Sequence, residues 1–271
     1  MSTSSLPLAS ILDFSAVVTR LRAAGCVFAE DEAELLLSTA RDPAEVESMV
    51  DRRTAGLPLE HVLGWAEFRG LRIAVDPGVF VPRRRTEFLI ERAAALAPAR
   101  AGAVVVDLCC GSGALGAALG AALERIALYA TDIDPAAVRC ARRNVKHVGG
   151  RVYEGDLYEP LPAALRGRVD VLLANVPYVP TAKVGLLPPE ARVHEARVAL
   201  DGGVDGLDVL RRVAAAAAAW LAPGGCLLFE TSRRQAAAAV EIVTRDGLRP
   251  TVAECEEREA TVVIATRPPH G

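Results

Sequence analysis

The stretch DLCCGSGALG, residues 107–116, decides the fold because it joins an apolar strand to the helix that follows it. Residues 103–108 are rich in Val, as in a buried strand, and the segment 113–123 is rich in Ala and Leu, as in a helix. The stretch contains the pattern G-x-G-x-x-G, and Asp132 follows about 20 residues further on, as in a dinucleotide-binding unit. It therefore predicts a strand, a glycine turn and a helix N-terminus that meet at a ligand.

From residue 103 onward, short apolar runs alternate with helical segments, as expected for a parallel sheet with helices on both faces. Only residues 256–259 separate the last two apolar runs, so these two strands must pair antiparallel, because a parallel crossover needs a dozen residues or more. The prediction is an α/β, Rossmann-like fold with a seven-stranded sheet. Strands are expected near 103–108, 126–131, 151–154, 169–174, 225–231, 249–254 and 260–266. Helices are expected near 87–97, 113–123, 135–146, 205–221 and 233–246.

The first part of the chain predicts a small helical domain over residues 1–60. Within residues 10–56, Gly25 ends a first helical segment, the Leu run at 35–37 centres a second, and Asp42 is placed to cap a third. Three short helices form too small a bundle to be stable alone. The domain is therefore expected to be an appendage of a larger one.

Residues 61–86 are interrupted by glycines and prolines, and we interpret them as a β-hairpin connector before a larger domain at 87–271. Short strands are expected at 68–75 and 79–81. The three arginines at 83–85 are interpreted as a solvated surface rather than as a contact with a phosphate or a partner.

Composition and charge narrow the classes of protein. The 271 residues are 51% hydrophobic and carry a net charge of −3, so no overall positive field is available to hold a nucleic acid. The six cysteines lack C-x-x-C spacing and the four histidines lie apart from them, so we expect thiols in a reducing compartment and no metal site. Because no signal-peptide pattern and no membrane-length apolar run is present, we expect a cytoplasmic protein without membrane contact. A monomer is expected because nothing in the sequence demands a larger assembly.

Acidic residues follow the first three predicted strands. Asp107 precedes the glycine turn, Asp132 ends the second strand, and Asp156-Leu157 follows the third. A carboxylate before the glycine turn repels a pyrophosphate but suits the sulfonium and ammonium groups of S-adenosylmethionine. Asp132 can accept both ribose hydroxyls, and Asp156 is placed to meet the adenine, although Gly155-Asp156 is also an ordinary turn. The acids at one sheet edge favour this methyl donor over NAD.

The tetrapeptide NVPY, residues 175–178, follows the fourth predicted strand. Asn175 offers an amide carbonyl and Val176 a main-chain carbonyl. Pro177 favours an extended conformation of the preceding residue, and Tyr178 supplies a flat aromatic wall. Two hydrogen-bond acceptors beside an aromatic ring suit the binding of an –NH2 group while its nitrogen reacts. The same residue types are also common punctuation between a strand and a loop.

Together with these motifs, further segments show a resemblance to the protein N5-glutamine methyltransferases that modify peptide-release factors. The likeness extends over nearly the whole chain. The segments that carry it beyond the cofactor loop are LG at 63–64, EF at 67–68, VFVPR at 79–83, TE at 86–87, GDLYEP at 155–160, NVPY at 175–178, ALDGG at 199–203, DGL at 205–207 and PGG at 223–225.

The resemblance implies a class I S-adenosylmethionine-dependent methyltransferase fold and a helical N-terminal domain that engages a protein substrate, with a peptide-chain release factor as the candidate. It implies that Asn175 and the Val176 carbonyl hold the glutamine amide. The residues expected at the catalytic position are Asn175, Val176, Pro177 and Tyr178. Those expected to bind the cofactor are Asp107, Cys109, Gly111, Gly113, Asp132, Ile133, Asp156, Leu157 and Asn175.

Three departures from the family pattern suggest a side branch. Val176 replaces the first Pro of Asn-Pro-Pro-Tyr, which frees Asn175 from its restraint. The usual Pro-Arg-Pro-Glu-Thr-Glu segment is PRRRTE at 82–87, and Cys109 stands where a Gly is common. None of these changes removes an acceptor, so methyl transfer remains the expectation and the identity of the protein substrate is open.

A plausible mechanism needs no strong base. If Asn175 and the Val176 carbonyl each accept one N–H, the amide nitrogen is held with its lone pair facing the methyl group, and positive charge on the nitrogen is stabilised. The N-methylated, still protonated amide is acidic enough to lose its proton to water. His194 and Glu195 lie in the loop after the tetrapeptide and are expected to be surface residues rather than pocket residues.

Three other functions fit part of the sequence. An adenine-N6 DNA methyltransferase uses the same Asn-x-Pro-Tyr grip but would be expected to have a basic DNA-reading region. A dinucleotide-dependent reductase is disfavoured by Asp107 and by the lack of a proton donor near the site. A catalytically silent protein would bind S-adenosylmethionine and methylate nothing.

Overall fold

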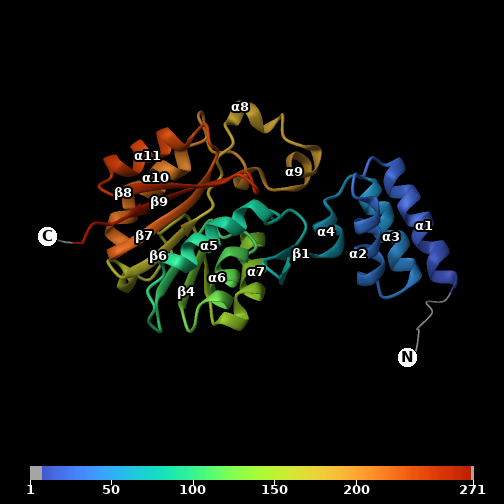
Figure 1. Cartoon of the computed structure of the whole chain (residues 1–271), viewed down its shortest axis with the longest axis horizontal. Helices are drawn as coiled ribbons and strands as arrows, with labels where there is room; N and C mark the ends of the chain where they lie inside the picture. Colours follow the sequence, from blue (N-terminus) through green and yellow to red (C-terminus); the bar gives the residue numbers. More distant parts are fainter. Residues whose placement is uncertain (1–7, 270–271) are drawn as a thin grey trace.

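The computed structural model describes residues 8–269, and their side chains from Phe14 onward. Its body is a seven-stranded sheet in the order β5-β4-β3-β6-β7-β9-β8 (Figure 1). Neighbouring strands are parallel except that β9 pairs antiparallel with both β7 and β8, which confirms the predicted seven strands and antiparallel end. The strands are β3 (Val104–Leu108), β4 (Ala127–Asp132), β5 (Arg151–Glu154), β6 (Val169–Ala174), β7 (Leu221–Thr231), β8 (Arg249–Cys255) and β9 (Ala260–Thr266).

Two hydrophobic cores lie on the two faces of this sheet. One contains side chains from α5 (Glu87–Leu96), α6 (Ala114–Ala122) and α7 (Pro135–Asn144), and the other contains side chains from α10 (Asp208–Trp220) and α11 (Ala236–Arg245). Figure 1 shows these two groups of helices on opposite sides of the sheet. The strand order runs outward from β3 in one direction and from β6 in the other. The carboxyl ends of β3 and β6 therefore flank the switch point at which open α/β sheets bind ligands.

Four helices form a separate bundle at one end of the molecule (Figure 1). The three predicted ones are α1 (Leu8–Ala23), α2 (Ala29–Thr39) and α3 (Pro43–Thr54), and Asp42 caps α3 by accepting the Glu45 N–H at 2.8 Å. The short α4 (Leu59–Leu63) was not predicted. The predicted boundary at 60 falls inside it, and the part of the predicted domain before residue 8 lies outside the described chain.

A hairpin follows the bundle. The predicted strand at 68–75 contains one of its strands but also covers the turn, and the predicted strand at 79–81 was wrong. The hairpin pairs β1 (Trp65–Phe68) with β2 (Leu71–Ala74). Arg69 and Gly70 both have positive φ, 50° and 73°, which suits a two-residue hairpin turn, and no signal beyond the glycine marked it. Residues 79–81 form no strand; the Val79 carbonyl instead lies 2.8 Å from His61 Nε2 of the bundle.

Two other element boundaries differ from the predictions. α10 begins at Asp208 rather than 205. β7 begins at Leu221 rather than 225, because Leu221 pairs with Val169 before a register shift in the strand. The remaining short elements are α8 (Thr181–Val184), α9 (Pro189–His194), and the 3₁₀ turns η1 (Arg84–Thr86), η2 (Lys146–Val148), η3 (Ala163–Leu165) and η4 (Arg197–Ala199).

All six cysteines are free thiols. Across the described part of the chain, every helix is too short or too polar to cross a membrane.

Candidate active site

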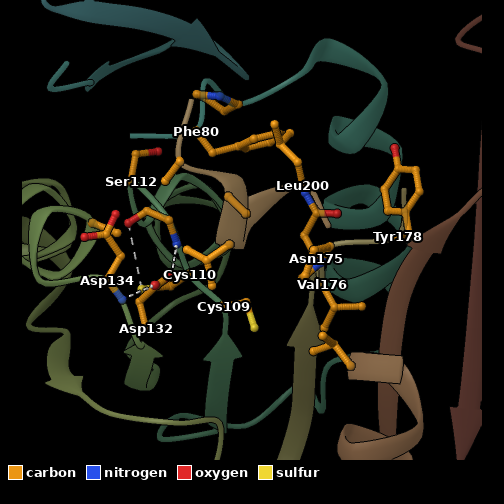
Figure 2. Close-up of a pocket in the computed structure, with 18 of the residues that line it drawn as sticks. Phe80, Cys109, Cys110, Ser112, Asp132, Asp134, Asn175, Val176, Tyr178 and Leu200 are labelled. Carbon is orange, nitrogen blue, oxygen red and sulfur yellow. Dashed lines mark hydrogen bonds between the residues drawn. The ribbon is translucent and has the colours of Figure 1, made fainter. Parts of the chain in front are cut away.

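A cavity of about 430 Å³ lies at the carboxyl ends of β3, β4 and β6. Every residue expected at the catalytic or cofactor position lines it, with the exception of Gly113. Figure 2 shows Asp132 and Asp134 on one side of this cavity and Asn175, Val176 and Tyr178 on the other, with Cys109 between them and Phe80 and Leu200 closing the space. The sequence motifs thus meet at one site, although they are far apart in the chain.

Asp107 is the penultimate residue of β3 and is buried. Burial raises the pKa of its carboxyl group to about 7, and the hydrogen bond that Oδ2 accepts from the Gly116 N–H, at 3.0 Å, opposes that rise. A side chain on Gly116 would lie 3.2 Å from this carboxylate and 3.1 Å from Leu128, so the last glycine of the motif permits close packing of α6 on the sheet.

The glycine turn is fixed by Asp132. Its Oδ2 accepts the Gly111 N–H at 2.8 Å and its Oδ1 accepts the Asp134 N–H at 2.9 Å. Burial raises the pKa of Asp132. Gly113 has φ of 76°, and a Cβ there would lie 3.0 Å from Ala141 of α7, so this glycine allows helix packing and lies outside the cavity lining. Cys109 adopts a left-handed φ of 53°, which explains why a glycine would be comfortable at its position.

Asp156 is not free at the mouth of the cavity. It forms an ion pair of 2.5 Å with Arg212 of α10, a partner that the sequence did not reveal because 56 residues separate the two. The next residue, Leu157, has φ of 48° and its carbonyl accepts the Thr131 hydroxyl at 2.8 Å. The turn after β5 is therefore held in a defined shape, with both residues at the cavity wall.

The tetrapeptide leaves two acceptors at the cavity. Asn175 Oδ1 is buried and has no hydrogen-bond partner, and no donor to the Val176 carbonyl is present among residues 8–269. Leaving a buried acceptor unpaired costs about 1–3 kcal/mol, so such a group is expected where a ligand supplies the donor. The Val176 side chain packs into the hydrophobic core below the cavity.

A hydrogen-bond network fixes the Tyr178 hydroxyl group. Its hydroxyl donates to Glu230 Oε1 at 3.2 Å and accepts a hydrogen bond from Arg85, whose Nε also donates to Glu230 at 2.7 Å. Thr86 donates to the other oxygen of Glu230 at 2.6 Å. Burial raises the pKa of Tyr178 to about 12, so the phenol stays protonated. Glu230 was not predicted as a site residue; the signal for it in the sequence is a carboxylate within the apolar run of β7.

The expected solvated surface is found at Arg84, whereas Arg83 and Arg85 are partly exposed but each pairs with a buried carboxylate. Arg84 is on the surface, with 85% of its side chain exposed, but Arg83 and Arg85 line the cavity. Arg83 pairs with Glu195 at 2.5 Å. Glu195 is buried rather than on the surface, also accepts the Val81 N–H at 3.2 Å, and has a pKa raised by burial. The charge run could not show which arginines point inward.

The segment that carries α8, α9 and η4, residues 181–199, lines the cavity on the side of the tetrapeptide. We call this segment the roof, and the side that it covers the substrate side. Its lining residues are mostly apolar and include Leu187, Pro188, Ala191, Val198 and Leu200. Glu190 in α9 pairs with Arg53 of the bundle at 2.6 Å, and Figure 1 shows α9 on the side of the body nearest α4. The roof thus contacts the N-terminal helices directly.

The seven-stranded sheet with its antiparallel end, and a cavity that opens at the β3 and β6 ends, define a class I, Rossmann-like methyltransferase. A family model described as "Methyltransferase small domain" matches residues 70–205. A release factor glutamine methyltransferase of Geobacter sulfurreducens is 40% identical over 75% of this chain and 71% of its own length. The chain belongs to the release factor glutamine methyltransferase family.

Two further likenesses widen the comparison. A protein of Streptomyces pristinaespiralis named 4-amino-L-phenylalanine/4-methylamino-L-phenylalanine methyltransferase is 35% identical over 84% of this chain and 80% of its own length. The crystal structure of a methyltransferase from Pyrococcus furiosus has a TM-score of 0.55 at 16% identity, covers 82% of this chain and 98% of its own, and supports the fold.

Proposed function

We propose that the protein transfers a methyl group from S-adenosylmethionine to the side-chain amide nitrogen of a glutamine in a protein substrate, with a peptide-chain release factor as the candidate. The unpaired Asn175 Oδ1 beside the free Val176 carbonyl carries this proposal, because an –NH2 group has two N–H donors to offer. The names of relatives such as the Geobacter protein support the choice of glutamine and of a release factor. Such a substrate would place the reaction in the cytoplasm.

The acids of the cavity suit the cofactor. S-adenosylmethionine supplies an electrophilic methyl group on a cationic sulfonium. Asp107 and Asp132 would hold its positively charged part and its ribose hydroxyls, and Asp156 with Leu157 would meet the adenine. Asp107 is buried and costly to ionise without a cation nearby, which is the observation that favours a cationic ligand.

The tetrapeptide positions the nucleophile. An amide nitrogen is a weak nucleophile because its lone pair is delocalised into the carbonyl. When Asn175 and the Val176 carbonyl each accept one N–H, the lone pair is turned toward the open side of the cavity and the charge that develops on nitrogen is stabilised. The proton leaves to water, so no side chain acts as a strong base. The Tyr178 ring closes one wall and, with its raised pKa, stays neutral.

We further propose that the N-terminal bundle, over residues 1–60, recognises the protein substrate. The contact between Arg53 and Glu190 links the bundle to the roof, so a protein bound there would lie next to the cavity.

Transfer of a tritiated methyl group into a cell lysate tests the proposed function. Label is expected in protein and at glutamine when the labelled peptide is mapped. Label removed by nuclease would instead support methylation of adenine in DNA, and no label in any fraction would support a silent binding protein.

A second candidate is methyl transfer to the amine of a free amino acid, as the name of the Streptomyces relative describes for that protein. The roof favours it, because it encloses the substrate side of the cavity with apolar residues. Label in the small-molecule fraction of the lysate would decide for this candidate.

Binding of the cofactor can be tested separately. Asp132→Ala removes the contact with the Gly111 N–H in the glycine turn, the contact with the Asp134 N–H and the proposed acceptor for the ribose, so the Kd for S-adenosylmethionine is expected to rise at least about tenfold. Isothermal titration calorimetry measures this Kd. An unchanged Kd would contradict the assignment of Asp132.

A further inference from the structure

Two guanidinium groups lie at the cavity beside the tetrapeptide, where the methylation of a neutral amide does not itself require a cation. Arg83 and Arg85 both line the cavity beside Phe80, Pro82 and Tyr178. Their side chains are 35% and 45% exposed, so each keeps a face toward the open space.

Each guanidinium is anchored from behind by a buried carboxylate. Arg85 Nε donates to Glu230, and Arg83 Nη2 donates to Glu195 at 2.5 Å. The Nη1 group of each has no acceptor among residues 8–269. Because hydrogen bonds to the protein fix one edge of each guanidinium group, the N–H groups of the other edge are already oriented, like a fork. A ligand that binds to them therefore costs little further side-chain conformational entropy.

Glu195 and Glu230 pair with the two arginines from the protein side and leave the cavity-facing edges of the guanidinium groups open to an anion. The nitrogen that accepts a methyl group becomes more positive, and an anionic group between it and those edges would stabilise that charge. The remaining carboxylate in the lining of this side of the cavity belongs to Glu190, which pairs with Arg53 of the bundle. The chain itself therefore does not place a free carboxylate against the two arginines.

We propose that Arg83 and Arg85 form a subsite for a carboxylate of the substrate molecule that carries the methylated nitrogen. A planar carboxylate matches the paired N–H groups of a guanidinium. The carboxylate can come from an acidic side chain next to the target glutamine or from the α-carboxylate of a free amino acid. The subsite rests on the proposed methyl transfer and adds to it a requirement for a negative charge close to the accepting nitrogen.

Matched probe pairs test the subsite. One pair is a five-residue peptide with a central glutamine flanked by Asp and the same peptide flanked by Asn. The other is N-acetyl-L-glutamine, which has an α-carboxylate, and N-acetyl-L-glutaminamide, which does not. For each probe, kcat/KM with S-adenosylmethionine and the calorimetric Kd for protein loaded with S-adenosylhomocysteine are measured.

The variants are Arg85→Gln, Arg85→Lys and the control Arg84→Gln, which changes the neighbouring exposed arginine. The parent is expected to prefer the charged member of at least one pair by about tenfold or more, as for one charge-assisted hydrogen bond. In Arg85→Gln the ratio of kcat/KM between the charged and the neutral member should fall close to one, whatever the change in the absolute rate through Tyr178; Arg85→Lys should restore part of the ratio, and Arg84→Gln should keep it.

The pair that shows the preference identifies the source of the carboxylate. Equal kcat/KM and Kd for both members of both pairs in the parent protein would overturn the subsite. An equal loss on charged and neutral probes in Arg85→Gln would also overturn it, because that is the effect of a structural role through Tyr178. If no probe accepts a methyl group, the proposed methylation of glutamine fails, and the Kd values for the acetylated pair alone decide the subsite.

Discussion

Asp107 combines burial with a position on the wall of the cavity, so its ionisation is coupled both to folding and to ligand binding. Its pKa of about 7 in the folded protein exceeds the value of about 3.9 for an exposed Asp, because burial disfavours the carboxylate. The folded state therefore binds this proton more tightly than the unfolded state. The contribution of Asp107 to the free energy of unfolding accordingly decreases as the pH rises from about 4 to about 7.

Binding of a cationic cofactor should have the opposite dependence on pH. A sulfonium favours the ionised carboxylate, so the affinity for S-adenosylmethionine is expected to rise about tenfold or more between pH 5.5 and pH 7.5. Calorimetry across this range measures the effect, and Asp107→Asn should bind more weakly at pH 7.5 with a flatter profile. Parallel profiles for the parent and the Asn variant would show that Asp107 does not face the cation.

At the scale of single residues, the sequence predicted those that belong to local motifs. Asp107, Asp132 and Asn175 lie within one residue of the carboxyl end of a strand, and the ends of neighbouring parallel strands must meet at one edge. Glu230 and Arg212 escaped prediction because their partners lie 145 and 56 residues away in the chain, and no local pattern encodes such pairs.

At the scale of elements, the loop that follows the roof fixes the tetrapeptide. The Gly202 N–H donates to the Val179 carbonyl at 2.8 Å, and a Cβ on Gly202 would lie 2.6 Å from the Pro177 carbonyl oxygen. A Cβ on Gly206 would lie 2.3 Å from the Tyr178 carbonyl oxygen. The glycines of this loop therefore permit its backbone to pack directly against the backbone of the tetrapeptide.

Gly206→Ala should disturb the acceptors of the tetrapeptide. The position has φ of 81°, and the new methyl group would clash with the main chain, so kcat is expected to fall at least about tenfold while cofactor affinity changes little. Gly185→Ala is the matched control, since that glycine has φ of −65° and no atom within 4 Å of the added Cβ. Similar activity of the two variants would mean that the loop does not position the tetrapeptide.

Long periodic elements were predictable, and short ones were not. β6 matches its prediction at both ends because a β-branched apolar run is bounded by polar residues. α4, α8 and α9 have four to six residues, too few for a helical period to be recognised, and their geometry depends on contacts with distant parts of the chain.

At the scale of the whole molecule, the helical bundle and the sheet body have separate hydrophobic cores that are joined by the hairpin and a few polar contacts. Arg53 is central to these contacts. It pairs with Glu32 inside the bundle, where both side chains are only 10% exposed, and with Glu190 in the roof. Its guanidinium also donates to the Leu57 carbonyl at 3.0 Å.

Arg53→Ala should lower the free energy of unfolding by about 3 kcal/mol, because it leaves the buried Glu32 carboxylate without its partner. Chemical denaturation followed by circular dichroism measures this change. Arg41→Ala, which removes an exposed pair with Glu45, should change the free energy of unfolding far less, because solvent screens that pair. Equal effects of the two substitutions would show that the Arg53 pair has no special role in stability.

The most direct test of the proposed chemistry is the rate of methyl transfer by Asn175→Ala in a single turnover, measured together with its affinity for S-adenosylmethionine. Loss of the unpaired amide oxygen should reduce the rate about 100-fold or more and change the Kd less than about twofold. A variant that transfers the methyl group as fast as the parent would contradict the role of Asn175 in holding the –NH2 group.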